Sequence, residues 1–327
     1  MKWTQKTIET AEGRVNAVCP EIVSASRSTD IPAFYPEWFV QQFRQGYVRW
    51  QNPFSQQVQY VSFEKTCAFV FWSKNPAPLI PHLRMLDELG IPYYFLFTLN
   101  DYDDEGFEPN VPPLEQRAKV FRELSDRLGK ERVVWRFDPL IVTDELTVGK
   151  LLEKVKRVGE KLRPYTEKLV FSFIDIAKYM TVRRNLARAG HYWKDIRHDD
   201  KLRIAEGLAA LNKIWRLSVT SCAEKLDLSA YGIMHSKCID ENLLFRISRE
   251  DSPLRRFLVS QGIGQSELFV NPRKRRNNQR ADCGCFPSKD IGRYSTCKHF
   301  CVYCYANSSP TAVAANAARI NNHGDCI

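Results

Sequence analysis

A cluster of cysteines near the C-terminus is the feature of this sequence that most directly predicts chemistry. The stretch TCKHFCVYCYAN (296–307) contains Cys297, Cys301 and Cys304 with the spacing Cys-x3-Cys-x2-Cys. Thiolates are soft ligands that suit iron–sulfur clusters or zinc. Three irregularly spaced thiolates can hold three corners of a cubane and leave the fourth iron open, whereas structural zinc sites usually have a closed set of four ligands. The motif therefore predicts a 4Fe-4S cluster, with zinc as the alternative.

Four further cysteines form a candidate second metal site. Cys222 and Cys238 are sixteen residues apart, and Cys283 and Cys285 flank a single glycine. Four thiolates fit a fully ligated 4Fe-4S cluster or a structural zinc ion, and we expect the cluster. The alternative is four buried core cysteines. His299 lies inside the first motif, and for it we expect a hydrogen-bonded role rather than metal ligation.

Ionisable and amide side chains follow several apolar segments of the chain. At the carboxyl ends of parallel strands such side chains can line a reactive pocket. Taken singly, each is also a common turn or helix-cap residue. Together they indicate a pocket, in which we assign catalytic roles to Arg27, Asp30, Lys74, Arg136 and Asp138 and cofactor-binding roles to Asn100 and Asp175.

Six short apolar runs, rich in β-branched and aromatic residues, are expected to form strands. They are residues 21–26, 67–72, 92–99, 132–137, 168–174 and 216–221. Amphipathic stretches at 78–89, 114–128, 145–160 and 200–214 predict helices between them. This alternation predicts an α/β fold with right-handed crossovers. We expect a partial (β/α)6 TIM-like barrel, with a doubly wound open sheet as the alternative.

The pattern changes after the sixth strand, which divides the chain into two parts. Residues 1–239 are expected to form the six-unit barrel, and residues 240–327 a C-terminal segment packed on it. That segment begins with one predicted helix at 240–260, continues through the basic run NPRKRRNNQR (271–280) and the cysteines, and ends in a partly helical tail from about 306.

Composition and charge indicate where in the cell the protein is expected and which classes of partner it is expected to bind. Neither a signal-peptide apolar region nor a run near the roughly 18 apolar residues of a membrane span is present. We therefore expect a cytoplasmic protein that does not bind membranes. Its net charge of +10 favours polyanions, including nucleic acid. The basic run is either a phosphate-binding stripe or a solvated loop. P-loop, Gly-x-Gly-x-x-Gly and HExxH motifs are missing, so nucleotide hydrolysis and zinc proteolysis lack support.

The stretch CKHFCVYCYAN resembles the cluster motif of the radical S-adenosylmethionine superfamily, Cys-x3-Cys-x-aromatic-Cys, and is particularly similar to the form in spore photoproduct lyase. The resemblance implies a 4Fe-4S cluster on the three cysteines, S-adenosylmethionine on its open iron, and Tyr303 beside the adenine. It implies reductive formation of a 5′-deoxyadenosyl radical that abstracts hydrogen from a substrate. Such an enzyme needs an electron donor, for which flavodoxin or ferredoxin is expected. The superfamily core is also a partial six-stranded barrel.

Two features depart from the usual pattern of that superfamily. The motif follows the sixth predicted strand rather than the first. Lys74-Asn75-Pro76 stands where those enzymes carry a Gly-Gly-Glu segment.

Nearly the whole chain also resembles a bacterial family defined only as a domain of unknown function (DUF1848). The matching segments are 24–39, 69–76, 135–140, 221–228 and the closing cysteine stretch. That resemblance implies no activity. Three hypotheses therefore stand: a radical S-adenosylmethionine enzyme, a non-radical iron–sulfur protein that transfers electrons or acts as a Lewis acid, and a zinc-stapled nucleic-acid-binding protein.

Overall fold

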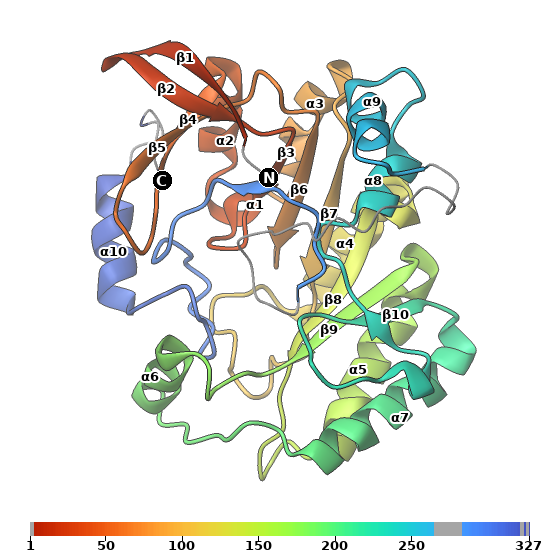
Figure 1. Cartoon of the computed structure of the whole chain (residues 1–327). Helices are drawn as coiled ribbons and strands as arrows, with labels where there is room; N and C mark the ends of the chain where they lie inside the picture. Colours follow the sequence, from red (N-terminus) through yellow and green to blue (C-terminus); the bar gives the residue numbers. More distant parts are fainter. Residues whose placement is uncertain (1–2, 265–282, 321–323, 325–326) are drawn as a thin grey trace.

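The computed structural model describes residues 3–264 and 283–320, together with Gly324 and Ile327. Its centre is an eight-stranded parallel sheet with the order β11-β10-β9-β8-β7-β6-β3-β12 (Figure 1). The strands are β3 (Ile22–Ala25), β6 (Ala68–Ser73), β7 (Tyr93–Thr98), β8 (Val133–Leu140), β9 (Lys168–Phe173), β10 (Ser218–Ser221), β11 (Met234–His235) and β12 (Lys289–Asp290).

All six predicted strands are present, and they lie side by side in chain order from β3 to β10. The α/β class is therefore confirmed. Strands β3 to β11 follow one another in chain order across the sheet, whereas β12, late in the chain, pairs with β3 at the opposite edge. The sheet is open, with β11 and β12 at its edges, and a closed barrel is not formed by the described residues.

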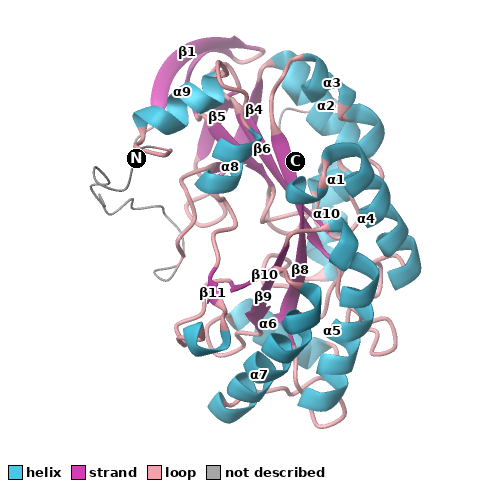
Figure 2. Ribbon diagram, turned by 90° about the vertical axis from the view of Figure 1, so that its right-hand side faces the viewer, coloured by secondary structure: helices cyan, strands magenta, loops and turns pink. Residues whose placement is uncertain are grey.

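Side chains of the sheet alternate between two buried faces, as the two-residue repeat of a strand requires. Phe69, Phe71, Phe95 and Phe97 point into one core, with the helices that connect the strands. Val70, Tyr94, Leu96 and Val134 point into the other core, with helices α8 (Glu241–Ile247) and α9 (Pro253–Ser260). Figure 2 shows α3, α4 and α5 on one side of the strands and α8 and α9 on the other. Burial on both faces explains why these strands are continuous apolar runs.

The connecting helices are α1 (Ile31–Phe34), α2 (Pro36–Gln45), α3 (Arg84–Glu88), α4 (Leu114–Leu128), α5 (Val148–Leu162), α6 (Met180–Arg188) and α7 (His198–Trp215), and the tail contains α10 (Pro310–Arg319). The helices predicted at 114–128, 145–160 and 200–214 are confirmed as α4, α5 and α7. The helix predicted at 78–89 is confirmed only in part, by α3, and α1, α2 and α6 were not predicted. The prediction of one helix at 240–260 is wrong. Ser252 caps a new helix there, and Pro253 follows at its first position, so the segment divides into α8 and α9. Within the part described, no helix is both long and apolar enough to cross a membrane.

A second, four-stranded sheet near the N-terminus was not predicted. Its order is β1-β2-β5-β4, formed by β1 (Thr4–Thr10), β2 (Gly13–Cys19), β4 (Tyr47–Gln51) and β5 (Val58–Ser62). Most of β1 is exposed, so it lacks the apolar alternation by which a strand is recognised in sequence. The basic run 271–280 and Cys326 lie outside the described residues.

The contact between α5 and α7 provides a test of the helix layer. A Cβ atom on Gly159 would lie 2.2 Å from the Trp215 ring, which is fixed by a 2.8 Å hydrogen bond from its indole nitrogen to Glu160. Gly159→Ala should therefore lower the free energy of unfolding by about 1–3 kcal/mol, measured by urea titration. In the same helix, a Cβ atom on Gly149 would meet Thr147 Oγ1 at an ordinary contact distance of 4.0 Å, and Gly149→Ala should change stability by at most about 1 kcal/mol. Equal midpoints for the two variants would contradict this packing.

Candidate functional site

The cysteine motif lies in the loop before α10, and hydrogen bonds to its backbone fix its shape. The side-chain amide of Asn307 donates to the Cys297 carbonyl oxygen at 2.8 Å, and the Asn185 amide donates to the Cys304 carbonyl oxygen at the same distance. The backbone N–H of Asn307 also approaches the Cys304 sulfur at 3.4 Å. The three predicted ligands are therefore presented by one ordered loop.

Burial strongly affects the three thiols. It raises the pKa of Cys297 to about 12, and the charge of Asp30 adds to this effect. Burial also raises the pKa of Cys301 well above its usual range, although the positive charge of Lys74 opposes the shift. The thiol of Cys304 behaves in the same way. Lys74 follows β6, and its ammonium nitrogen lies 3.1 Å from the Tyr303 hydroxyl, so the loop lies beside the carboxyl end of this strand.

One carboxylate, Asp30, connects this loop to two strand ends. It accepts hydrogen bonds from Ser73 Oγ and from the Lys74 backbone N–H, both at 2.7 Å, and it caps α1 through Ala33. The His299 ring nitrogen Nε2 lies 2.8 Å from the same carboxylate. Four partners therefore surround Asp30, and its geometry fits positioning better than direct chemistry. His299 has the hydrogen-bonded role expected from the sequence.

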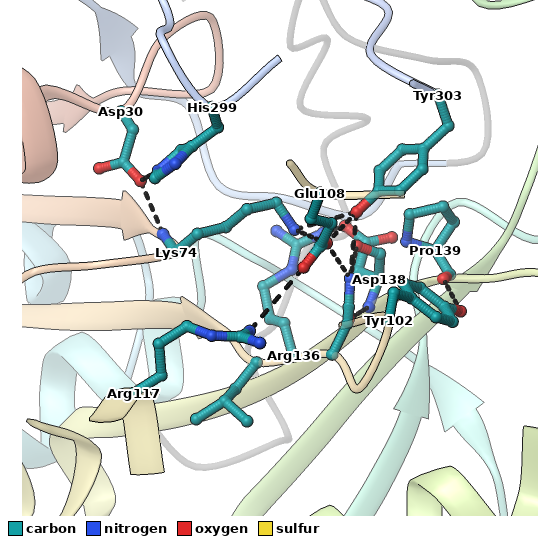
Figure 3. A network of polar contacts seen from close by, with 12 residues as sticks. Asp30, Lys74, Tyr102, Glu108, Arg117, Arg136, Asp138, Pro139, His299 and Tyr303 are labelled. Carbon is teal, nitrogen blue, oxygen red and sulfur yellow. Dashed lines mark hydrogen bonds and ion pairs between the residues drawn. The ribbon is translucent and has the colours of Figure 1, made fainter. Parts of the chain in front are cut away.

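A second buried carboxylate, Glu108, gathers four side chains around it (Figure 3). Lys74 Nζ and Asn100 Nδ2 each donate to Glu108 Oε1 at 2.7 Å, and the Tyr303 hydroxyl donates to the same oxygen. The guanidinium of Arg117, fully buried, lies 3.8 Å from Oε2. Burial alone would raise the pKa of Glu108, but the charges of Lys74 and Arg117 lower it to about 2. Lys74 and Tyr303 thus form one network with a residue that the sequence analysis did not identify.

The network extends from Glu108 to β8 through Asn100 and Asp138. The backbone N–H of Asp138 donates to Asn100 Oδ1 at 2.8 Å, and the Asp138 carboxylate accepts from Ser172 Oγ and from Arg136. Arg136 also lies 3.6 Å from the Cys238 sulfur. Figure 3 shows Arg136 and Asp138 close to Glu108 and Tyr303. The polar residues predicted after β6, β7 and β8 are therefore brought together.

The second cysteine set is also assembled in space. The Cys222 and Cys238 sulfurs lie 3.4 Å apart, and the Cys285 sulfur accepts the backbone N–H of Cys238 at 3.1 Å. Hydrogen bonds from Cys222 and Cys285 hold the pKa of Cys238 well below its usual range, and the hydrogen bond with Cys285 lowers the pKa of Cys283 to about 7. Four cysteines from distant parts of the chain thus share one location.

Two predicted residues lie outside the central network. Arg27 donates its backbone N–H to Asp290 at 2.8 Å, in a loop where Ser24, Ser26 and Ser28 also donate to that carboxylate. Its guanidinium charge nevertheless acts on Cys283. Asp175 is half-exposed, accepts the Lys178 backbone N–H at 3.3 Å and pairs with the Lys178 ammonium group. The described contacts therefore give Asp175 no link to the cysteines.

The cysteines supply soft donor atoms, whose chemistry suits iron–sulfur clusters and zinc. Among the described residues, however, no group of three or more Cys, His, Asp or Glu side chains is arranged so that it could hold a metal ion. The thiols are nevertheless grouped as three and four, and cations lie beside each group. Arg136 Nε and Ser236 Oγ are buried and have no hydrogen-bond partner in this part of the chain. The geometry thus supplies soft donors, neighbouring cations and unused polar groups.

Glu108 and Asp290 were the residues that sequence reasoning missed. Glu108 stands in a loop of turn-forming residues, EGFEPN, and no apolar run precedes it directly. Asp290 follows Lys289 in a two-residue strand. Local spacing gives no signal for either residue, because their partners are up to 266 residues away in the chain.

Replacing Glu108 tests the network. We expect Glu108→Gln to lower the free energy of unfolding by about 3–5 kcal/mol, because Lys74 and Arg117 lose their buried countercharge. The pKa of Glu108 is lowered from 4.5 to about 2 on folding, so its contribution is complete above pH 4.5 and is lost as the pH falls towards 2. The difference between variant and wild type, measured by denaturant titration, should shrink over that range.

A surface pair provides the control for this variant. Glu115 lies 2.8 Å from Lys161, and its side chain is 73% exposed. Glu115→Gln should therefore change the unfolding free energy by less than about 1 kcal/mol. If Glu108→Gln cost no more than this control, the proposed buried charge network would be wrong.

The comparisons with known proteins identify the family of the chain without identifying an activity. No curated protein and no solved structure matches it. A family model described as "Domain of unknown function (DUF1848)" matches residues 22–306, a range that covers β3 to the end of the cysteine motif. The chain therefore belongs to the DUF1848 family.

Proposed function

We propose that this protein is an iron–sulfur enzyme of the radical S-adenosylmethionine type, with a 4Fe-4S cluster on Cys297, Cys301 and Cys304. One observation carries the proposal: the buried Cys301 and the partly buried Cys297 and Cys304, on one fixed loop, lie beside the polar network at the carboxyl ends of parallel strands. When bound, such a cluster would supply the electron that cleaves S-adenosylmethionine and initiates hydrogen abstraction from the substrate.

The charge around the thiols supports this proposal. Thiols with raised pKa values are neutral until a metal displaces their protons. Three thiolates would then carry negative charge in a buried place, and the Lys74 ammonium group is the nearby cation that offsets it. Glu108 fixes that ammonium group through a 2.7 Å ion pair. Lys74 therefore has an electrostatic role at the site in this proposal.

The predicted cofactor-binding residues differ in how free they are to bind a ligand. Tyr303 is held by Glu108, and its ring lies 5.6 Å from the Lys74 ammonium nitrogen, so it would form a fixed wall beside the cluster. Asn100 is completely buried and uses both of its amide atoms within the network. We therefore assign Asn100 to holding Tyr303 and Asp138 in place, and we retain Asp175 only as a rim residue.

We also retain the interpretation of the open sheet as a partial TIM-like barrel. The one-directional strand order and the reactive side chains at the carboxyl ends favour it. The cysteine loop comes late in the chain and follows β12. Because β12 pairs with β3, the first strand of the sheet in the chain, the loop is expected to lie at the ends of the strands. A flavodoxin- or ferredoxin-like donor would supply the electron.

Replacing Cys301 tests the cluster. After anaerobic reconstitution, the wild type should bind about four irons for this site, and its reduced electron paramagnetic resonance signal should shift on addition of S-adenosylmethionine. Cys301→Ser should lose most of that iron and the shift. Cys19→Ala, which changes a buried cysteine of the four-stranded sheet, should retain both.

The other two hypotheses give different results in the same measurement. An iron signal that ignores S-adenosylmethionine would favour electron transfer or Lewis-acid chemistry. Zinc without iron at Cys297, Cys301 and Cys304 would favour the zinc-stapled binding protein. Unchanged iron and an unchanged signal in Cys301→Ser would eliminate the assigned ligand set.

The proposed substrate class is nucleic acid, on the basis of the net charge of +10 and the basic run 271–280. Phosphate contacts release counterions, so affinity for a short DNA or RNA duplex should fall steeply between about 50 and 200 mM salt. Fluorescence anisotropy measures this dependence. Replacing Arg273, Arg275 and Arg276 with Gln should flatten it, whereas the same change at the exposed Arg203 should not. Absence of binding at the lower salt concentration would remove nucleic acid as the substrate.

A further inference from the structure

The two cysteine sets differ in how their sulfur atoms are related. Cys297, Cys301 and Cys304 belong to a single loop. In the second set, the Cys222 and Cys238 sulfurs are in direct contact at 3.4 Å. The Cys285 sulfur accepts the backbone N–H of Cys238 at 3.1 Å, and Cys283 stands two residues before Cys285.

The distance between sulfurs distinguishes one metal ion from a cluster. Four thiolates around a single zinc ion, each with a Zn–S bond of about 2.3 Å, form a tetrahedron whose edges are about 3.8 Å long. In a 4Fe-4S cluster each thiolate binds a different iron, so the body of the cluster keeps the ligand sulfurs out of mutual contact. The contact between Cys222 and Cys238 fits the tetrahedron.

The surrounding charges also suit a set of four thiolates on one divalent ion, which has a net charge of about −2. Arg136 is buried, and its Nη1 lies 3.6 Å from the Cys238 sulfur. Cations that contact metal ligands in this way orient them and offset their charge.

We propose that Cys222, Cys238, Cys283 and Cys285 bind a single zinc ion in a structural site that is separate from the proposed iron–sulfur centre. This replaces the second iron–sulfur cluster that the sequence analysis favoured. Cys222 and Cys283 are only partly buried, so their side chains have room to turn towards the ion.

The position of the site indicates what the ion does. Cys222 follows β10, Cys238 follows β11, and Cys283 and Cys285 come shortly before β12. The backbone N–H of Phe286 donates to the Ile239 carbonyl oxygen at 2.9 Å, so the last two segments already touch there. One ion would fasten all three segments and anchor the segment that leads to the first cysteine motif. The proposed zinc is therefore a staple for that loop.

Metal analysis of the full-length protein tests the inference. Anaerobically purified wild type should contain one zinc per chain in addition to the iron of the first site. X-ray absorption at the zinc edge should show four sulfur neighbours at about 2.3 Å. Cys283→Ser should lower zinc affinity by at least about tenfold in a chelator competition, and Cys19→Ala should leave it unchanged.

The possible outcomes separate this inference from the proposed function. Zinc with four sulfur neighbours in a protein that binds no iron would support the staple and contradict the radical enzyme. About eight irons and no zinc, falling to about four in Cys283→Ser, would overturn the staple and leave the first cluster standing. Zinc with a mixed nitrogen and oxygen shell would also overturn it. The X-ray measurement uses the wild type, so it decides the question even if Cys283→Ser fails to fold.

Discussion

The paired burial of charge at the carboxyl ends of β6 to β8 is the constraint on which the rest of the site depends. Glu108, Lys74 and Arg117 are all withdrawn from water, and each is tolerable only because the others are present. This mutual requirement fixes three segments at once: the strand end at Lys74, the loop at Glu108 and helix α4 at Arg117. Tyr303 donates to the same carboxylate, so the cysteine loop takes its position from this charge group.

Asp30 adds a second attachment of the loop, which uses hydrogen bonds. Its carboxylate accepts hydrogen bonds from the end of β6 and from the first turn of α1, and it also contacts the His299 ring. His299 stands between Cys297 and Cys301, and Tyr303 stands between Cys301 and Cys304. The residues between the cysteines thus anchor the loop from two directions.

The parts of the fold that the sequence predicted are those encoded by neighbouring residues. Burial on both faces gives β3, β6 and β7 continuous apolar runs, and the ends of α4 and α7 were predicted to within two residues. The single helix at 240–260 failed because the break at Ser252-Pro253 was overlooked, although it was readable from the sequence. Glu108 and Asp290 had no such local signal. Their importance arises from partners that only the folded chain brings near, so no spacing rule could identify them.

Some of the positively charged side chains lie beside the cysteines and can balance charge there, in addition to the long-range attraction of polyanions by the chain. Lys74 lies beside the three-cysteine loop, and Arg136 and Arg27 lie beside the four-cysteine set. If seven thiols lose their protons on binding metal, the site gains a large negative charge in a place with little water. Buried cations next to each set reduce that cost, and Asp138 and Glu108 keep those cations paired before the metal arrives. The polar residues at the strand ends can therefore be explained by charge balance alone, and direct contact with substrate is not required to account for them.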